Sequence, residues 1–350
     1  MSPGEAAYIA AMRGRGLLPF GVSPFYASLA GPEKTDPIRR QFFPDPRESL
    51  PDPFALDDPL GEARHRAVPR LVHQYRDRAL LLAGGSCAGY CRHCFRRVWL
   101  ASPQGFIGGA ELGPVLGYLK THPEIREILV SGGDPLTAAD EKLAGLFRKL
   151  REARPGIGLR LCTRAPVTNP ARLGSGLIDI LRQYRPLRMA IHLNHPRELA
   201  DPVRLGLKAC LDGGIPVLVQ TVLLRGINDN PETLEELFRG CLELGLKPYY
   251  LFQPDLAPGT AHFRLPLKQG LALYRDLSAR LTPGGPRGSA GKDGPGLPAG
   301  LPVYAVDLPG GGGKVDLRED TIAGERQERG GKVYLLRGPD GRLWPYPADE

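Results

Sequence analysis

The sequence has no apolar run of about 18 residues, the length that a membrane-spanning helix needs. Its first residues, MSPGEAAYIAAMRGRG, lack the charged-then-apolar order of a secretory signal, so we expect a cytoplasmic protein. No block of Lys or Arg stands out either, although the formal net charge is +8. Because the basic residues are spread along the chain, we expect neither nucleic acid nor a membrane as a partner.

Cysteine is scarce: the 350 residues include six, and three of these lie between positions 87 and 94. A disulfide framework is not expected in a chain of this length, and so tight a cluster is typical of a metal site. The remaining three, Cys162, Cys210 and Cys241, are expected to be small, buried apolar residues.

Short apolar segments alternate with segments of helical spacing over most of the chain. Strands are expected at Ala79–Ala83, Glu127–Val130, Leu159–Cys162, Met189–Leu193, Val217–Leu224, Tyr249–Phe252 and Val303–Val306. Helices are expected at Leu112–Lys120, Asp140–Arg151, Pro231–Leu244 and Leu267–Leu281. This alternation implies parallel strands with helical crossovers, hence an α/β fold with a full or partial (β/α) barrel. An open doubly wound sheet is the alternative, but no G-x-G-x-x-G follows the first strand.

We divide the chain into four parts. Residues 1–70 form an N-terminal helical extension, 71–281 a core barrel, 282–300 a flexible Gly/Pro-rich insertion and 301–350 a C-terminal segment. In a barrel or a doubly wound sheet, the chemistry belongs at the carboxyl ends of the strands.

The clustered cysteines, Cys87, Cys91 and Cys94, follow the first expected strand with C-x3-C-x2-C spacing. Three thiolates can hold three irons of a 4Fe–4S cluster and leave the fourth iron open to a substrate. A zinc site with His93 or a distant residue as fourth ligand is the alternative, but zinc motifs favour paired C-x2-C units and no second pair exists here.

Two glycine motifs also follow expected strands. In the first, Gly132, Gly133 and Asp134 come after EILV, and paired glycines let the backbone approach a ligand closely. In the second, four glycines precede Lys314. The residues around them do not fit a P-loop, but a lysine held at a strand end can form a Schiff base with pyridoxal phosphate. A flexible linker is the alternative.

The cysteine spacing resembles that of the radical S-adenosylmethionine (SAM) superfamily. In combination with YRDRALLL, LVSGGDPL, CTRAPV, HLNHP, VLLRGIND, KPYYLFQPDLAPGTAHFR and VDLPGGGGK, the sequence resembles the lysine 2,3-aminomutase family, including its shorter elongation factor P-modifying relatives. The resemblance implies a partial TIM-like barrel of radical SAM type. It also implies three cofactors: a 4Fe–4S cluster on the three cysteines, SAM, and pyridoxal phosphate on Lys314 in the C-terminal segment.

The resemblance also implies roles for individual residues. For the substrate, Arg96 would bind the carboxylate, and Asp255 and Asp307 the distal ammonium. For the cofactors, the implied residues are Tyr75 and Arg78 near the pyridoxal phosphate, and His93, Gly132, Gly133, Asp134, Arg164, His192 and Gln220 near SAM.

The implied reaction is the isomerisation of L-lysine to β-lysine by a radical 1,2-amino migration. Alternatives are the same chemistry on another amino acid such as glutamate, β-lysine formation for elongation factor P, and a non-catalytic metal-binding module. The implied partners are an amino-acid substrate and an electron donor of flavodoxin or ferredoxin type.

The longer aminomutases bind zinc between subunits through a C-terminal cysteine cluster. Here no cysteine follows Cys241, and Asn230 stands at their fourth ligand position, so we expect no structural zinc and leave a homodimer open.

Overall fold

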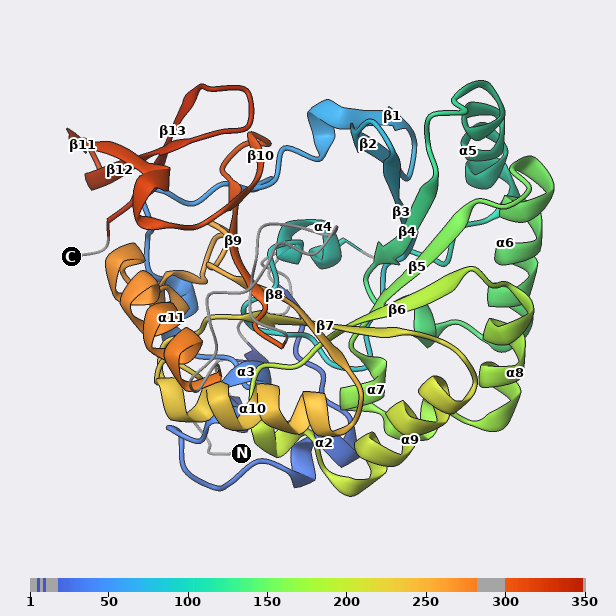
Figure 1. The fold of residues 1–350 in the computed structure, drawn as a ribbon, viewed down its shortest axis with the longest axis horizontal. Coiled ribbons are helices and arrows are strands. Elements are labelled where there is room, and N and C mark those ends of the chain that lie inside the picture. The colour runs from blue at the N-terminus through green and yellow to red at the C-terminus, as the bar shows by residue number, and fades with distance from the viewer. Residues whose placement is uncertain (1–4, 7–8, 11–17, 103, 282–299, 349–350) are drawn as a thin grey trace.

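The computed structural model describes residues 5–6, 9–10, 18–102, 104–281 and 300–348 (Figure 1). The expected insertion at 282–300 lies outside these residues, apart from Gly300. A ten-stranded sheet carries the fold, and its strands are ordered as they occur in the chain. They are β1 (Arg66–Val68), β2 (Leu71–Tyr75), β3 (Arg78–Gly84), β4 (Glu127–Gly132), β5 (Gly158–Thr163), β6 (Leu187–His192), β7 (Val217–Val222), β8 (Lys247–Phe252), β9 (Val303–Leu308) and β10 (Gly313–Asp316).

Strands β3 to β9 pair in parallel, each with the next one along the chain. Antiparallel partners extend the sheet at both ends, with β1 and β2 before β3 and β10 after β9. These seven parallel strands are the seven that the sequence predicts. Because the strand order never reverses, the helices gather on one face and the sheet curls as a partial barrel, which excludes the doubly wound alternative.

Helices cover the outer face of this curled sheet (Figure 1). The described helices are α2 (Pro24–Ser28), α3 (Pro37–Phe42), α4 (Arg97–Ala101), α5 (Gly109–Thr121), α6 (Asp140–Ala153), α7 (Ala165–Thr168), α8 (Ser175–Gln183), α9 (Asp201–Asp212), α10 (Pro231–Glu243) and α11 (Leu267–Leu281). Short 3-10 turns occur at η1 (Pro46–Ser49), η2 (Ala63–His65), η3 (Pro135–Thr137), η4 (Pro170–Arg172), η5 (Pro196–Glu198), η6 (Ala261–Phe263) and η7 (Glu319–Thr321). The four predicted helices are confirmed as α5, α6, α10 and α11. None of the described helices is long and apolar enough to cross a bilayer.

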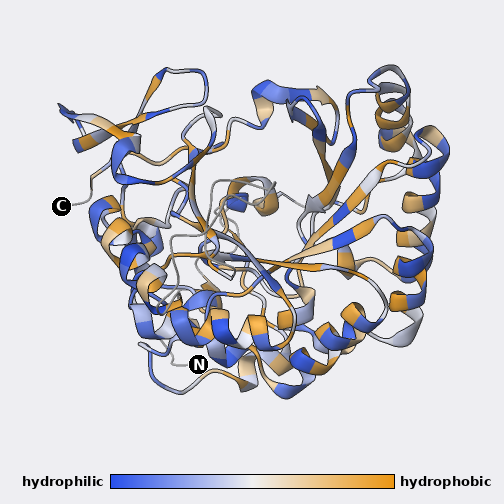
Figure 2. Ribbon diagram, viewed as in Figure 1, coloured by the Kyte–Doolittle hydropathy of each residue, from blue (hydrophilic) through white to orange (hydrophobic). Residues whose placement is uncertain are grey.

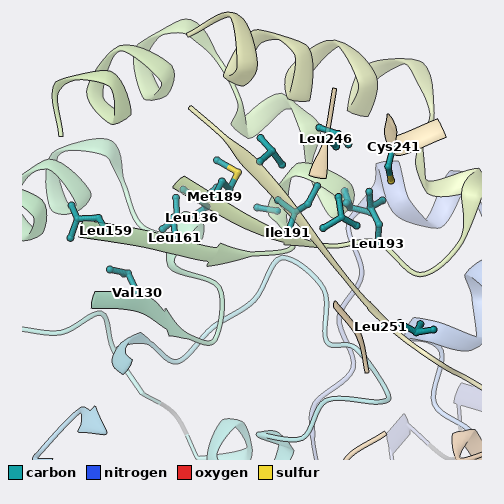
Figure 3. Packing of buried hydrophobic residues seen from close by; sticks show 14 of the residues in the cluster. Val130, Leu136, Leu159, Leu161, Met189, Ile191, Leu193, Cys241, Leu246 and Leu251 are labelled. Carbon is teal, nitrogen blue, oxygen red and sulfur yellow. The ribbon is translucent and has the colours of Figure 1, made fainter. Parts of the chain in front are cut away.

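The hydrophobic core lies between the strands and these helices. Side chains alternate along a strand, so Ile128 and Val130 of β4 are fully buried while Leu129 lies on the opposite face and is only partly buried. Figure 3 shows Val130 with Leu161 and Met189 of the neighbouring strands in this layer. Burial of each such side chain contributes about 1.5–3 kcal/mol. In Figure 2 both the strands and the helices around them are coloured as mixtures of hydrophobic and hydrophilic residues.

The two ends of the sheet meet through loops rather than through strand pairing. The backbone N–H of Gly310 donates to the carbonyl of Pro59 (2.7 Å), and Gln74 Nε2 donates to the carbonyl of Gly311 (3.2 Å). The N-terminal extension therefore contacts the glycine turn that precedes Lys314.

A second sheet follows the barrel strands. It contains β11 (Ile322–Glu328), β12 (Gly331–Arg337) and β13 (Leu343–Pro347), all antiparallel. The sequence analysis predicts none of these strands, and it also misses β1, β2 and β10.

Candidate active site

The three clustered cysteines lie in the loop between β3 and α4, at the carboxyl end of the parallel strands. All three thiols are free and partly exposed. Burial, together with the charges of Asp134 and the neighbouring thiols, raises the pKa of Cys87, and burial with Cys91 raises the pKa of Cys94 to about 11. Thiols gathered in this way lose their protons most readily when a metal takes the protons' place.

Buried ion pairs with the N-terminal extension hold this loop. The Arg92 side chain is fully buried and donates through Nε to Glu48 Oε1 (2.9 Å). Arg97, the first residue of α4, donates through Nη2 to the other Glu48 oxygen (2.7 Å), so one carboxylate holds an arginine of the loop and one at its end. The backbone adds Tyr90 N–H to the Gly21 carbonyl (2.9 Å). Glu48 carries no motif that would have revealed this role in the sequence.

The surroundings of the thiols fit a cluster with a bound ligand. Arg164 Nη1 donates to Cys91 Sγ (2.9 Å), while His93 Nδ1 and Arg164 Nε are buried with no partner among the described residues. Burial and the charge of Arg164 lower the pKa of His93 well below its usual value, so this imidazole is neutral and can accept a hydrogen bond. Among the described residues, no group of three His, Cys, Asp or Glu side chains is close enough together to hold a single metal ion. A cube-type cluster needs a different arrangement, with one thiolate at each of three irons.

The first glycine motif leaves no space for side chains. Gly132 has a φ of +112°, and a Cβ on it would lie 2.3 Å from the Gly84 carbonyl oxygen. A Cβ on Gly133 would lie 2.5 Å from the carbonyl oxygen of Ser86. The motif therefore packs the end of β4 directly against the start of the cysteine loop.

Asp134 serves the framework of this region. Its carboxylate accepts hydrogen bonds from the backbone N–H groups of Leu136 (3.0 Å), Arg164 (2.8 Å) and Ala165 (2.8 Å) and from Thr163 Oγ1 (2.6 Å). All four donors belong to the chain, so Asp134 joins the glycine turn to the end of β5 rather than offering its oxygens to a ligand.

His192 and Gln220 are neighbours across β6 and β7, and their side chains are hydrogen-bonded. Burial, followed by the charge of Arg164, lowers the pKa of His192 to about 4, so the ring is neutral at physiological pH. Arg164 itself is held by Glu198 Oε1, 2.6 Å from its Nη2. These side chains form a polar wall beside the cysteine loop.

Lys314 projects from a hairpin at the opposite end of the sheet. In the antiparallel register it lies opposite Asp307, and its Nζ donates to Asp307 Oδ2 (2.7 Å). The same Nζ lies 4.0 Å from the ring centroid of Phe252 and 5.0 Å from that of Tyr250. The backbone N–H of Lys314 donates to the Tyr75 hydroxyl (3.1 Å).

Asp255 belongs to the same group of charges. Burial and the negative charge of Asp307 raise its pKa well above the usual value, against the opposing effects of Lys314 and Arg96. A carboxyl in this setting holds its proton to higher pH unless a cation approaches it.

Arg96 has a partner that the sequence analysis did not anticipate. Its Nη2 lies 2.6 Å from Glu62 Oε1, and its Nε lies 3.1 Å from both Glu62 oxygens. Its Nη1 donates to Ser131 Oγ (3.2 Å). Burial alone would lower the pKa of this guanidinium, but the charge of Glu62 and its hydrogen bonds raise it.

Comparison with known proteins identifies the family of this chain. The model of the radical SAM superfamily matches residues 82–238. A Treponema pallidum protein, named as a candidate L-lysine 2,3-aminomutase, is 43% identical over 93% of this chain and 89% of its own length. The chain belongs to the lysine 2,3-aminomutase family. The L-lysine 2,3-aminomutase of Clostridium subterminale is 32% identical over 94% of this chain and 75% of its own, and the glutamate 2,3-aminomutase of Clostridioides difficile is 31% identical over 93% and 72%.

Membership of this aminomutase family makes the protein an isomerase of radical SAM type. It implies a 4Fe–4S cluster, SAM and pyridoxal phosphate as cofactors. The non-catalytic metal-binding module is thereby excluded.

Two groups of predicted residues emerge in this aminomutase. The first surrounds the cysteine loop and contains His93, Gly132, Gly133, Asp134, Arg164, His192 and Gln220. The second contains Tyr75, Arg78, Arg96, Asp255, Asp307 and Lys314. Arg96 connects the groups, because it follows Cys94 in the chain and its charge acts on Asp255. Cys210 and Cys241 are buried as predicted, but Cys162 is partly exposed and close enough to Arg96 to affect its pKa.

Proposed function

We propose that this enzyme is an L-lysine 2,3-aminomutase that binds pyridoxal phosphate on Lys314 and converts L-lysine to β-lysine. The observation that carries the proposal is the electrostatic grouping of Asp255 and Asp307 with Lys314 and Arg96. Two carboxylates beside the cofactor lysine suit a substrate with a cationic end, and an arginine suits the carboxylate at its other end.

The cofactors supply the chemistry that side chains lack. The cluster with SAM supplies a carbon radical that removes a hydrogen atom, and pyridoxal phosphate supplies an aldehyde for the substrate amine and a ring that can delocalise an unpaired electron. The described residues bind and orient the reacting groups.

Asp255 and Asp307 would hold the distal ammonium of lysine. Asp307 accepts a hydrogen bond from the Lys314 ammonium, so this carboxylate would also suit the ammonium of a substrate. Because the pKa of Asp255 is raised by burial and by Asp307, an incoming ammonium stabilises its ionised form. A glutamate substrate would instead bring a third carboxylate to this pair, and like charges in a buried site repel.

The remaining residues would hold the cofactors. Tyr75, with Arg78 5.3 Å from its ring centroid, would contact the phosphate side of pyridoxal phosphate. Tyr250 and Phe252 border Lys314 and would exclude water from the cofactor ring. The SAM group would be His93, Arg164, His192, Gln220 and the backbone at Gly132 and Gly133, with Asp134 positioning them.

The test is an anaerobic turnover assay with reconstituted cluster, SAM, pyridoxal phosphate and a chemical reductant. Each of L-lysine, L-glutamate and other amino acids is supplied alone, and the β-amino acid is measured by chromatography. We expect β-lysine from L-lysine. Formation of β-glutamate without β-lysine would contradict the proposed substrate.

We further propose an electron donor of flavodoxin or ferredoxin type, a cytoplasmic location and a homodimer without structural zinc. Mass measurement in solution and metal analysis test the last of these. A stoichiometric zinc content would contradict it.

A further inference from the structure

The ion pair between Glu62 and Arg96 occupies the edge of the guanidinium that best suits a carboxylate. Both Nε and Nη2 contact Glu62, with nitrogen–oxygen distances of 2.6 to 3.1 Å. The two side chains are 14% and 13% exposed, so solvent screens the pair only weakly. A guanidinium has two such edges, Nε with Nη2 and Nη1 with Nη2. Glu62 takes the first edge, and on the second Nη1 donates to Ser131 Oγ (3.2 Å). A substrate carboxylate that binds through Nε and Nη2 must therefore displace Glu62.

The segment that carries Glu62 is built against the glycine turn of Lys314. Asp58 fixes its local shape by accepting from the backbone N–H groups of Glu62 (2.9 Å) and Ala63 (2.8 Å). Gly61, with a φ of +63°, lies so close to Gly310 that a Cβ would be 2.6 Å from the Gly310 carbonyl oxygen. The Glu62 carboxylate is thus held by the same contacts that bring the extension to the cofactor lysine.

We propose that Glu62 competes with the α-carboxylate of the substrate for Arg96 and so determines which anions the site accepts. The inference rests on the proposed role of Arg96 in substrate binding. A free anion must displace an internal carboxylate that is already at high effective concentration. An amino acid that is held through its amine and its side chain brings its own carboxylate at a comparable effective concentration, and it can therefore exchange with Glu62.

Substrate binds only to enzyme in which Arg96 is free of Glu62. The apparent affinity is therefore the intrinsic affinity multiplied by the fraction of enzyme in which Arg96 is free. Replacement of Glu62 by glutamine keeps the shape and removes the charge. We expect E62Q to bind L-lysine about tenfold more tightly and to bind acetate as a competitor of lysine. We expect 1,5-diaminopentane, which is lysine without its carboxylate, to bind both proteins equally.

The experiment is equilibrium dialysis of the cofactor-loaded enzyme with labelled ligand, without SAM or reductant, so that no turnover occurs. Asp57→Asn is the matched control, because it removes an exposed carboxylate from the same segment. Glu62→Asp, which keeps the charge on a shorter side chain, is expected to give an intermediate affinity and provides a second test if E62Q folds poorly. Unchanged or weaker lysine binding by E62Q, with wild-type iron content and melting temperature, would overturn the proposal.

Failure of the proposed function gives a different result. If the wild type binds another amino acid in place of lysine, the proposed substrate is wrong, and the same comparison is made with that amino acid, because the α-carboxylate is common to both. If the wild type binds no amino acid, both proposals fail. If it binds lysine and E62Q does not differ, only the role of Glu62 is wrong.

Discussion

The cysteine loop and the Lys314 hairpin reach the same site by different physical means. Buried ion pairs with residues far away in the sequence hold the loop, such as Glu48 with Arg92 and Arg97. Backbone register and a glycine turn hold the lysine, which lies opposite Asp307 in an antiparallel pair. The cysteine loop should therefore be sensitive to loss of charge. The Lys314 hairpin should be sensitive to changes of backbone conformation.

Lys314→Ala should have the largest effect. The cofactor loses its attachment point while the cysteine loop keeps its own supports, so we expect normal iron content and no visible absorption from lysine-bound pyridoxal. Isomerisation should fall by about a thousandfold or more, as expected for loss of a covalent anchor. Iron analysis, the visible spectrum and turnover measure this. Loss of the cluster together with the pyridoxal would show that the cysteine loop and the Lys314 hairpin are not independent.

Glu48→Gln tests whether buried ion pairs hold the cysteine loop. It leaves two buried arginines without a carboxylate, and breaking a buried pair costs about 3–5 kcal/mol. We expect a lower free energy of unfolding in denaturant and poor iron incorporation. The matched control is Glu152→Gln, which removes a carboxylate from an exposed pair with Arg148 and should cost less than about 0.5 kcal/mol. Equal losses in both variants would contradict the difference between the regions.

Asp255→Asn separates binding from stability. Removal of one carboxylate from a desolvated charge pair should weaken L-lysine binding by about 100-fold. Because burial raises the pKa of Asp255 in the folded protein above that in the unfolded chain, its carboxyl contributes stability at low pH that is lost as pH rises through the folded pKa. The variant should therefore be more stable than the wild type at pH 8, by about 1 kcal/mol, and the difference should shrink in acid. Melting temperatures of both proteins at several pH values test whether the variant is the more stable one at high pH.

Alanine substitutions of two neighbouring glycines in the turn before Lys314 should give the smallest effects. Both Gly310 (φ +66°) and Gly311 (φ +88°) are left-handed, so alanine at either position costs about 1–2 kcal/mol of backbone strain. A Cβ on Gly310 meets no heavy atom within 4 Å, whereas on Gly311 it would lie 2.9 Å from the Leu60 carbonyl oxygen. We expect Gly311→Ala to lower pyridoxal occupancy more than Gly310→Ala. The reverse order would mean that conformation alone, and not contact with the extension, controls the turn.

Prediction from sequence succeeded where the signal is local. The seven parallel strands contain short apolar runs because their outer faces pack against helices, and these runs predict all seven strands. Strand β11, IAGERQE, was missed because it is mostly exposed and has little apolar alternation. Glu62 and Glu48 were missed for another reason: a glutamate in a polar segment is most often a surface residue, and nothing in the sequence names its partner.

Local sequence specifies which chemical groups this protein carries: three thiols at a spacing that suits one iron–sulfur cluster, and one lysine after four glycines. The tertiary structure alone decided what each charged group faces. It paired Arg96 with Glu62, filled the oxygens of Asp134 with internal donors and raised the pKa of Asp255. The physical reason is that periodicity and spacing act along the chain, whereas desolvation and Coulomb interactions depend on distances through space that only the folded chain creates.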